Sequence, residues 1–379
     1  MYKKFFMGIA AMAALTLVSC SSDDLNSLSD NSSKNEAISF DSYLGRSAVA
    51  VNGTRGSVET KETLIGEGKG FGVFGYHNSS ATDHNSTPEE SFEANLFNNQ
   101  PVTCPNTGAN WTYSPLKFWP TQGHIDFLAY APYDANTALK KTTEASGTAS
   151  KNTSCIDFNV DKEIAKQKDL LWANAANKTK DNITGKKVKF HFYHALSRLG
   201  YTVKLYGNGD YSSNKATFTV DKITLAGSPD GTSENAFYKK GTIDLSKANN
   251  AGDLWNTSSA NGAKQKFDLV SNKPLGKDGI KSDKEYLFVI PQNFSQEGNT
   301  LYVYVKYTIN YTDGTPAVTN TVYKKLTTNF KQGKAYMLNL TLGLPIEFDV
   351  DVVEEWIAPE DGTGDINIGS NDNKPWDKD

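Results

Sequence analysis

The sequence predicts an all-β protein built from two tandem antiparallel β-sandwich domains. Three observations support this fold class. Several segments alternate between apolar and polar residues, turn-forming residues separate them, and helical periodicity is scarce. Length supports two domains, because 360 of the 379 residues remain once the first 19 are removed as a secretion signal, and one sandwich core seldom holds so many residues.

The strongest strand pattern covers residues 300–311, where every second residue is apolar from Leu301 to Tyr311. Residues 335–343 and 346–352 continue this alternation, the latter with Ile346, Phe348 and Val350 against acidic neighbours. Such alternation is typical of antiparallel sheets with one packed and one wet face. Weaker strand patterns cover residues 70–76, 125–130, 187–193, 201–206, 217–225 and 286–290.

Local irregularities refine this pattern. The apolar phase slips by one residue within 217–225, which predicts a β-bulge near Asp221. Asp313-Gly314 separates two strand patterns and predicts a hairpin. Residues 161–176 fit either one short helix or a loop, because Ile164, Leu170 and Trp172 are only loosely periodic.

We expect the chain to be organised as follows: a signal peptide at residues 1–19, a flexible tether at 20–36, a first β-sandwich at 37–195, a second at 196–368, and a polar tail at 369–379. The tether is rich in Ser, Asn and Asp, so it buries little apolar area.

The N-terminus reads as a lipoprotein signal. Lys3 and Lys4 precede an apolar run that is too short to remain as a membrane helix. The run ends in Leu-Val-Ser before Cys20, so we expect Cys20 to receive the lipid that anchors the protein to the outer membrane. Acidic residues directly after Cys20 favour display on the cell surface.

Two further cysteines, Cys104 and Cys155, either pair or stay free. In an exported protein a disulfide here could add about 4 kcal/mol, but spacing alone does not show whether the Cα atoms approach closely enough. No histidine stands near either cysteine at the spacing of a zinc site.

Arginine is scarce: among 39 basic residues only three are arginines, and Arg46 and Arg55 lie close together near the start. A chain that confines arginine in this way suits processing by an arginine-specific protease.

Other functional classes find little support. Removing Lys3 and Lys4 takes the formal charge from −4 to −6, which argues against nucleic acid as a partner. His191 and His194 point to opposite faces of a strand, so a structural role is favoured over a metal site. No catalytic constellation emerges, and we expect neither an enzyme nor a cofactor.

A set of short motifs, in order and spacing, resembles the fimbrillin family of Bacteroidetes. The resemblance covers residues 37–368, and its markers are Ala-Ile-Ser-Phe at 37–40, Thr-Arg-Gly at 54–56, Phe-Gly-Val-Phe-Gly-Tyr at 71–76, Lys-Phe-Trp-Pro at 117–120, Asp-Phe-Leu-Ala-Tyr-Ala-Pro at 126–132, Asp-Leu-Leu-Trp-Ala at 169–173, His-Ala-Leu-Ser-Arg-Leu at 194–199, Gly-Lys-Ala-Tyr at 333–336, Val-Glu-Glu-Trp at 353–356 and Gly-Thr-Gly-Asp-Ile-Asn-Ile at 362–368.

The resemblance implies transthyretin-like sandwiches and a lipidated subunit whose N-terminal segment is removed after an arginine. It also implies head-to-tail polymerisation with other fimbrial subunits by donor-strand insertion. The discarded strand would lie in residues 37–44, with Ile38, Phe40 and Leu44 on one face. Cleavage would follow Arg55, which lies in the matching motif, or Arg46, and the donor strand would lie within residues 346–368.

The alternative is a surface lipoprotein or fimbrial tip that does not polymerise and that binds a glycan or a host protein. Aromatic residues in loops, such as Trp111 and Trp255, would then contact the ligand.

Overall fold

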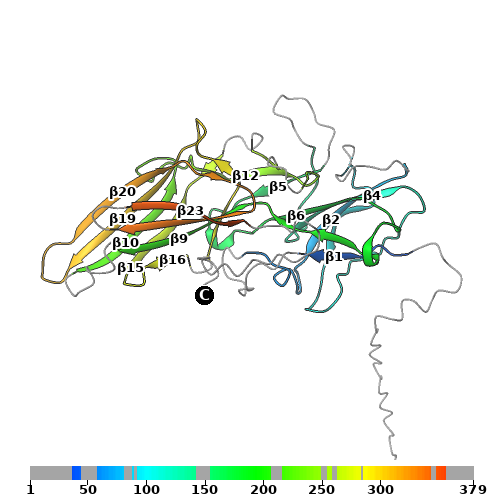
Figure 1. The fold of residues 1–379 in the computed structure, drawn as a ribbon, viewed down its shortest axis with the longest axis horizontal. Helices are drawn as coiled ribbons and strands as arrows, with labels where there is room; N and C mark the ends of the chain where they lie inside the picture. The colour runs from blue at the N-terminus through cyan, green and yellow to red at the C-terminus, as the bar shows by residue number, and fades with distance from the viewer. Residues whose placement is uncertain are drawn as a thin grey trace, which may run out of the picture. The chain divides into compact units, whose positions relative to one another are not determined.

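Two β-sheets form the second half of the chain. The first has the order β15-β10-β19-β20, with β15 at Phe267–Leu275, β10 at Ala216–Ala226, β19 at Leu301–Tyr311 and β20 at Val318–Leu326. The second has the order β16-β9-β22-β23, with β17 also on β9; the bounds are β16 Ile280–Lys281, β9 Ser197–Leu205, β22 Lys334–Leu342, β23 Glu347–Glu355 and β17 Leu287–Val289. Figure 1 shows β10, β19 and β20 side by side.

The structure is a computed structural model. It describes residues 36–43, 58–80, 88, 92–141, 154–205, 216–248, 254–257, 263–282, 285–342 and 347–355. From Ala37 onward the chain belongs to one compact unit. Within the described residues there is no α-helix, only the 3₁₀ turns η2 at Ile164–Lys166 and η3 at Thr184–Lys186. None of the described helices is long and apolar enough to cross a membrane.

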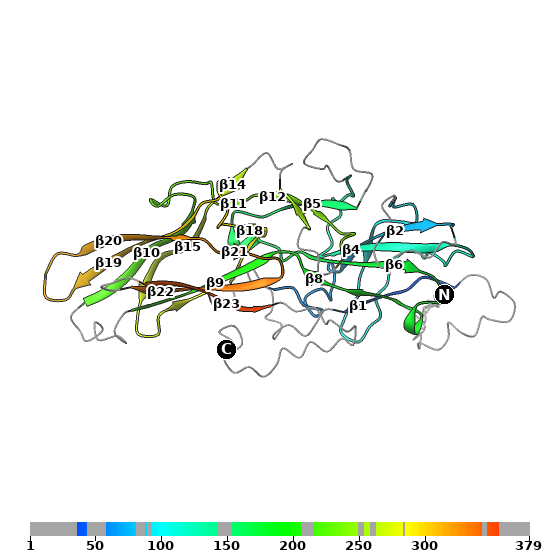
Figure 2. The same ribbon diagram turned by 45° about the horizontal axis from the view of Figure 1, so that its top comes forward.

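A five-stranded antiparallel sheet dominates the first half. Its order is β3-β2-β4-β6-β8, with β2 at Phe71–Asn78, β3 at Phe97–Val102, β4 at His124–Ala131, β6 at Leu171–Lys178 and β8 at Tyr193–His194. Both faces of this sheet are covered, because all eight residues of β4 are buried. One face packs against β1, Phe40–Tyr43, and its pairing partner β7, Val188–His191. Figure 2 shows β1 beside this sheet.

Short strands complete the fold. β5 (Cys155–Asn159) pairs with β12 (Lys240–Asp244), which also pairs with β13 (Trp255–Asn256). β11 (Phe237–Tyr238) pairs with β14 (Lys264–Gln265), and β18 (Gln292–Asn293) pairs with β21 (Asn329–Phe330). The pairing of β5 with β12 crosses residue 195, where the boundary between the two sandwiches was expected; that boundary stays a prediction.

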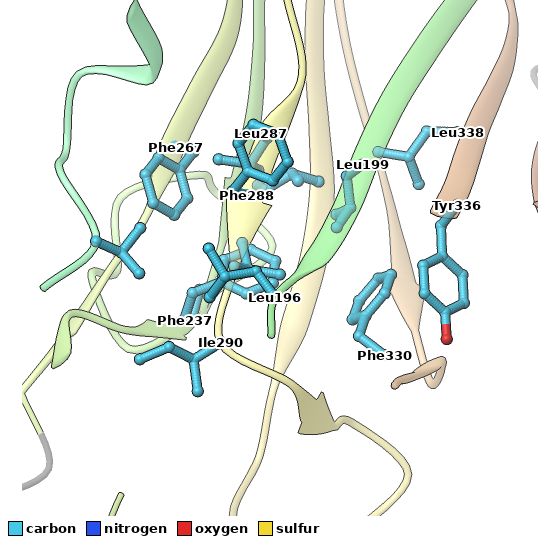
Figure 3. Close-up of a cluster of buried hydrophobic side chains, with 14 of the residues drawn as sticks. Leu196, Leu199, Phe237, Phe267, Leu287, Phe288, Ile290, Phe330, Tyr336 and Leu338 are labelled. Carbon is cyan, nitrogen blue, oxygen red and sulfur yellow. The ribbon is translucent and has the colours of Figure 1, made fainter. Parts of the chain in front are cut away.

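The hydrophobic core of the second half lies between its sheets. Leu199 of β9 and Leu338 of β22 lie beside Leu287 and Phe288 of β17, and Phe237 and Phe330 fill one end (Figure 3). All six side chains are at most 2% exposed, so this core supplies much of the apolar burial that stabilises the fold.

The predicted all-β class is confirmed, and so are several details. β19 buries Leu301, Val303, Val305 and Tyr307 in alternation. The register between β10 and β19 shifts between Val220 and Lys222, which is the bulge predicted near Asp221. Asp313-Gly314 connects β19 to β20, and Gly314 adopts a φ of 88°, which favours glycine in a tight turn.

The helix considered for residues 161–176 is wrong. Only Ile164–Lys166 form a 3₁₀ turn, and β6 begins at Leu171. Leu171, Trp172 and Ala173 are consecutive and all buried, because β6 lies inside a sheet that is covered on both faces. A continuous apolar run of this kind has no strand period to distinguish it from a helix.

Candidate functional site: the first strand and its surroundings

The first strand places its apolar side chains inside the protein. Ile38 and Phe40 are each 1% exposed and belong to the same core cluster as β2, β4 and β7. Ser42, next on the same face by alternation, is also buried. Ile38 and Phe40 therefore lie on one face of the strand, as predicted, whereas Leu44 lies outside the described residues.

Four aromatic rings surround Phe40, and we call them the Phe40 cage. Their centroids lie 5.3–5.7 Å from that of Phe40, and they belong to Phe97, Tyr113, Phe127 and Phe190. Aromatic pairs at such distances stabilise beyond the area that they bury. The site is therefore shaped for a phenyl ring.

Backbone partners hold the strand on both edges. On one side β1 runs parallel to β7, with Phe40 opposite Val188 and Ser42 opposite Phe190. On the other side Ile38 N donates to Lys117 O at 2.8 Å, and Tyr113 Oη donates to Ile38 O at 2.7 Å. Residues 37–43 thus lie between β7 and the segment 113–118, and these neighbours together form what we call the first-strand site.

One buried polar atom in this site lacks a partner. Ser42 is 3% exposed, and its hydroxyl Oγ makes no hydrogen bond to any residue that the structure describes. A buried hydroxyl without a partner costs roughly 1–3 kcal/mol. The first strand therefore fits its site imperfectly at this position.

A second cluster anchors the chain just after the two arginines. The backbone N–H of Glu59 donates to Asp169 Oδ2 at 2.9 Å, and Nδ1 of His194 lies 2.8 Å from the same oxygen. Asp169 is fully buried, and Leu64 extends the anchor into the apolar core. The segment that begins at residue 58 is thus attached independently of β1.

Electrostatics at this anchor are unusual. Burial raises the pKa of Glu59 to about 7, and the nearby Asp169 carboxylate adds to the rise, although a hydrogen bond from Thr63 opposes it. Close to neutral pH this carboxyl therefore changes charge.

His191 and His194, which the sequence placed on one strand, have different environments. His194 contacts Asp169, while burial, with the charges of Lys189 and Lys178 adding to it, lowers the pKa of His191. Among the described residues, no group of three or more His, Cys, Asp or Glu side chains is arranged to hold a metal ion.

The two cysteines are free in this structure, so the disulfide left open by the sequence is not formed. Cys104 Sγ donates to the carbonyls of Asn106 and Ala109, and Cys155 begins β5, which pairs with β12. Burial raises the pKa of the Cys155 thiol, with Asp244 adding to the effect, which keeps the thiol protonated. Cys20, Arg46 and Arg55 lie outside the described residues.

The two tryptophans that were considered as exposed ligand contacts, Trp111 and Trp255, are buried or partly buried. Trp111 is 7% exposed and packs on Phe71 at 4.9 Å. Trp255 is partly buried, and its Nε1 donates to Ala195 O at 2.7 Å. That expectation is wrong for both, because in each case the indole ring covers neighbouring apolar surface.

Sequence reasoning missed Tyr113, Glu59 and Asp169. Tyr113 lies in a loop with no periodicity, and the contact between Glu59 and Asp169 spans 110 residues of chain. One sequence signal was present for Asp169: it directly precedes an apolar run, where a carboxylate is unusual and indicates a buried interaction.

Comparison with known proteins agrees with this architecture. A family model described as fimbrillin-like matches residues 54–356. A fimbrial protein from Bacteroides vulgatus has a similar structure, with a TM-score of 0.60 and 21% identity over 86% of this chain and 100% of that one. A putative cell adhesion protein from Bacteroides uniformis matches at a TM-score of 0.47 and 17% identity, over 85% of this chain and 99% of that one. No curated protein sequence matches. Because the family model covers most of the chain, the protein belongs to the fimbrillin-like family.

Proposed function

We propose that this protein is a structural subunit of a cell-surface fimbria that polymerises by donor-strand insertion into the first-strand site. In this proposal Cys20 carries the lipid for export to the outer membrane, and a protease cleaves after Arg55, or alternatively after Arg46. A strand from the next subunit then takes the place of residues 37–43. The interface is head-to-tail and does not close, so it builds a filament.

The observation that carries this proposal is the separability of the first strand. Ile38 and Phe40 are core residues, yet they belong to the start of the chain, ahead of both arginines. Loss of residues 37–43 would expose the Phe40 cage and leave the backbone of β7 without its partner. Such a surface is costly until another strand covers it.

The anchor at Glu59 supports cleavage at Arg55. A new N-terminus at Gly56 would stand close in sequence to the bond between Glu59 N and Asp169, and to the buried Leu64. The mature chain would therefore begin at a point where it is already attached to the core.

The third arginine argues for selective cleavage. Arg198 lies on β9, is 8% exposed, and stacks over the ring of Tyr286 at 4.6 Å. A protease that needs an extended, accessible segment would not cut there in the folded chain. Arg46 and Arg55 remain as targets.

To test the proposal, the full-length chain is treated with an arginine-specific protease, and its N-terminus and polymer state are measured by mass spectrometry and by SDS-resistant ladders. Wild type should start at Gly56 and form ladders. Arg55→Lys keeps the charge but removes that cleavage site, so its chain should not start at Gly56, with Arg46→Lys as the matched control. The variant that carries both substitutions should neither be cleaved nor form ladders. Ladders formed by a chain that keeps residues 37–55 would contradict the proposal.

A glycan-binding or host-binding tip protein is the second candidate, and an aromatic pair with one exposed ring favours it. Tyr323 on β20 is 58% exposed, and its ring lies 6.1 Å from that of Tyr302 on β19. Exposed aromatic rings suit stacking against sugars. Loss of glycan or host-cell binding in Tyr323→Ala, with no polymer in wild type, would favour this function.

A further inference from the structure

We propose that residues 346–350 of a second copy of this chain replace residues 38–42 in the first-strand site, in the same direction and register. Phe348 then takes the position of Phe40, and Val350 takes that of Ser42. This inference rests on the proposed donor-strand function and assigns the donor segment and its register.

The two segments match in sequence. Residues 38–42 read Ile-Ser-Phe-Asp-Ser, and residues 346–350 read Ile-Glu-Phe-Asp-Val. They are identical at the two apolar positions that β1 buries, Ile38 and Phe40, each 1% exposed. They are also identical at Asp41, which lies opposite Lys189 of β7. The same direction is expected because the identities occur in the same order.

The Phe40 cage selects for a phenylalanine. Four rings within 5.7 Å leave a space that a smaller side chain would fill poorly. Residues 343–379 contain a single phenylalanine, Phe348. The later apolar segment Ile366-Asn367-Ile368 has no aromatic residue to place there.

The position of Ser42 gives a reason for the donor segment to replace the first strand. Ser42 is buried with an unpartnered hydroxyl. Valine at that position brings no polar atom to be desolvated and adds apolar area. The incoming strand thus keeps the contacts of Ile38 and Phe40 and removes the defect at Ser42.

Charge favours the same register. Glu347 and Asp349 alternate with the apolar residues of the donor segment, and Asp351 directly follows it. In the first-strand site these carboxylates would run alongside β7 and the residues just before it, which include Lys186, Lys187 and the exposed Lys189. Residues 38–42 bring one acidic residue, Asp41, to these lysines. The donor segment is therefore more complementary in charge than the first strand.

The present position of the donor segment is compatible with release. β23, which contains residues 347–350 of the donor segment, is at the edge of its sheet, and among the described strands its backbone pairs with β22 alone. Leaving this position breaks one ladder of hydrogen bonds, whereas the first-strand site offers partners on both edges.

The test uses two full-length chains, one with Lys189→Cys and one with Asp349→Cys, mixed during cleavage by an arginine-specific protease under mild oxidation. Disulfide-linked dimers are expected for this pair, and several-fold fewer when Asp349→Cys is replaced by Glu347→Cys or Asp351→Cys. Each chain alone serves as the control for the native cysteines. Lys189 is exposed, and the three donor positions are the polar ones of an alternating sequence, so cysteine at any of them replaces no apolar residue.

Val350→Thr tests the exchange step, because threonine matches valine in shape and restores a hydroxyl. Its polymers should dissociate about tenfold faster than wild type. Polymers that cross-link instead through Asn367→Cys, or in a shifted register, would overturn this inference and leave the proposed function standing. Absence of any polymer or intermolecular cross-link from the cleaved wild-type chain would overturn both.

Discussion

Replacing Phe40 with alanine should strongly destabilise the uncleaved protein and have no effect on the mature polymer. Phe40 is 1% exposed and contacts four aromatic rings at 5.3–5.7 Å. Truncation of a buried phenylalanine costs about 3–5 kcal/mol through lost transfer energy and the cavity left behind. The four ring contacts place Phe40→Ala near the upper end of this range, because each adds to the area term.

The assay is urea unfolding of the full-length chain before cleavage, followed by the same measurement on the polymer. Phe330→Ala is the matched control, since Phe330 is also 1% exposed and packs against Phe237, Phe294 and Tyr336. Both variants should lose stability before cleavage. After cleavage only Phe330→Ala should remain weaker than wild type, because Phe40 has left with its strand.

Two results would refute this reasoning. A loss below about 1 kcal/mol in the uncleaved Phe40→Ala chain would mean that the cage does not depend on its central ring. A polymer of Phe40→Ala subunits that unfolds earlier than wild-type polymer would mean that the first strand stays in place.

Two further predictions concern the anchor and the backbone. The pKa of Glu59 is raised from 4.5 to about 7 in the folded state, so its contribution to stability is fully present below pH 4.5 and is lost as the pH rises through 7. Wild type should therefore lose about 3 kcal/mol relative to Glu59→Gln between pH 4.5 and pH 8, measured by urea unfolding at both pH values, and an unchanged difference would contradict this assignment. Gly70→Ala should cost about 2–4 kcal/mol in the same assay, because Gly70 has a φ of 129° and an added Cβ would lie 2.2 Å from the Val102 carbonyl oxygen. Gly108→Ala, with a φ of 93° and no atom within 4 Å of the added Cβ, is the control and should lose about 1 kcal/mol or less; equal losses for both would show that the contact is unimportant.

Much of the second half of the fold was predictable from local pattern. β19 alternates along its whole length, and the phase slip in β10 and the turn at Gly314 are visible in neighbouring residues. These features depend on residues close in sequence, so period and turn chemistry are sufficient to predict them. That Ile38 and Phe40 lie on one face of the first strand was predictable for the same reason.

Both errors arose where burial depends on a second layer. β6 was considered as a helix because its two faces are covered and its apolar run has no period. Trp111 and Trp255 were expected in exposed loops, yet they pack against Phe71 and Phe158 from distant strands. A single sequence does not reveal which loop folds back onto which sheet.

The sequence by itself therefore determined the all-β class, most of the long strands, and a first strand with an apolar face ahead of two arginines. Only the tertiary structure decided that this strand runs parallel to β7, that four rings enclose Phe40, and that Ser42 is buried without a partner. It also decided that Asp169 and His194 hold the segment after the arginines. The physical reason is distance along the chain: alternation is a property of neighbouring residues, whereas these contacts join segments far apart in sequence, and close packing alone selects which of them meet.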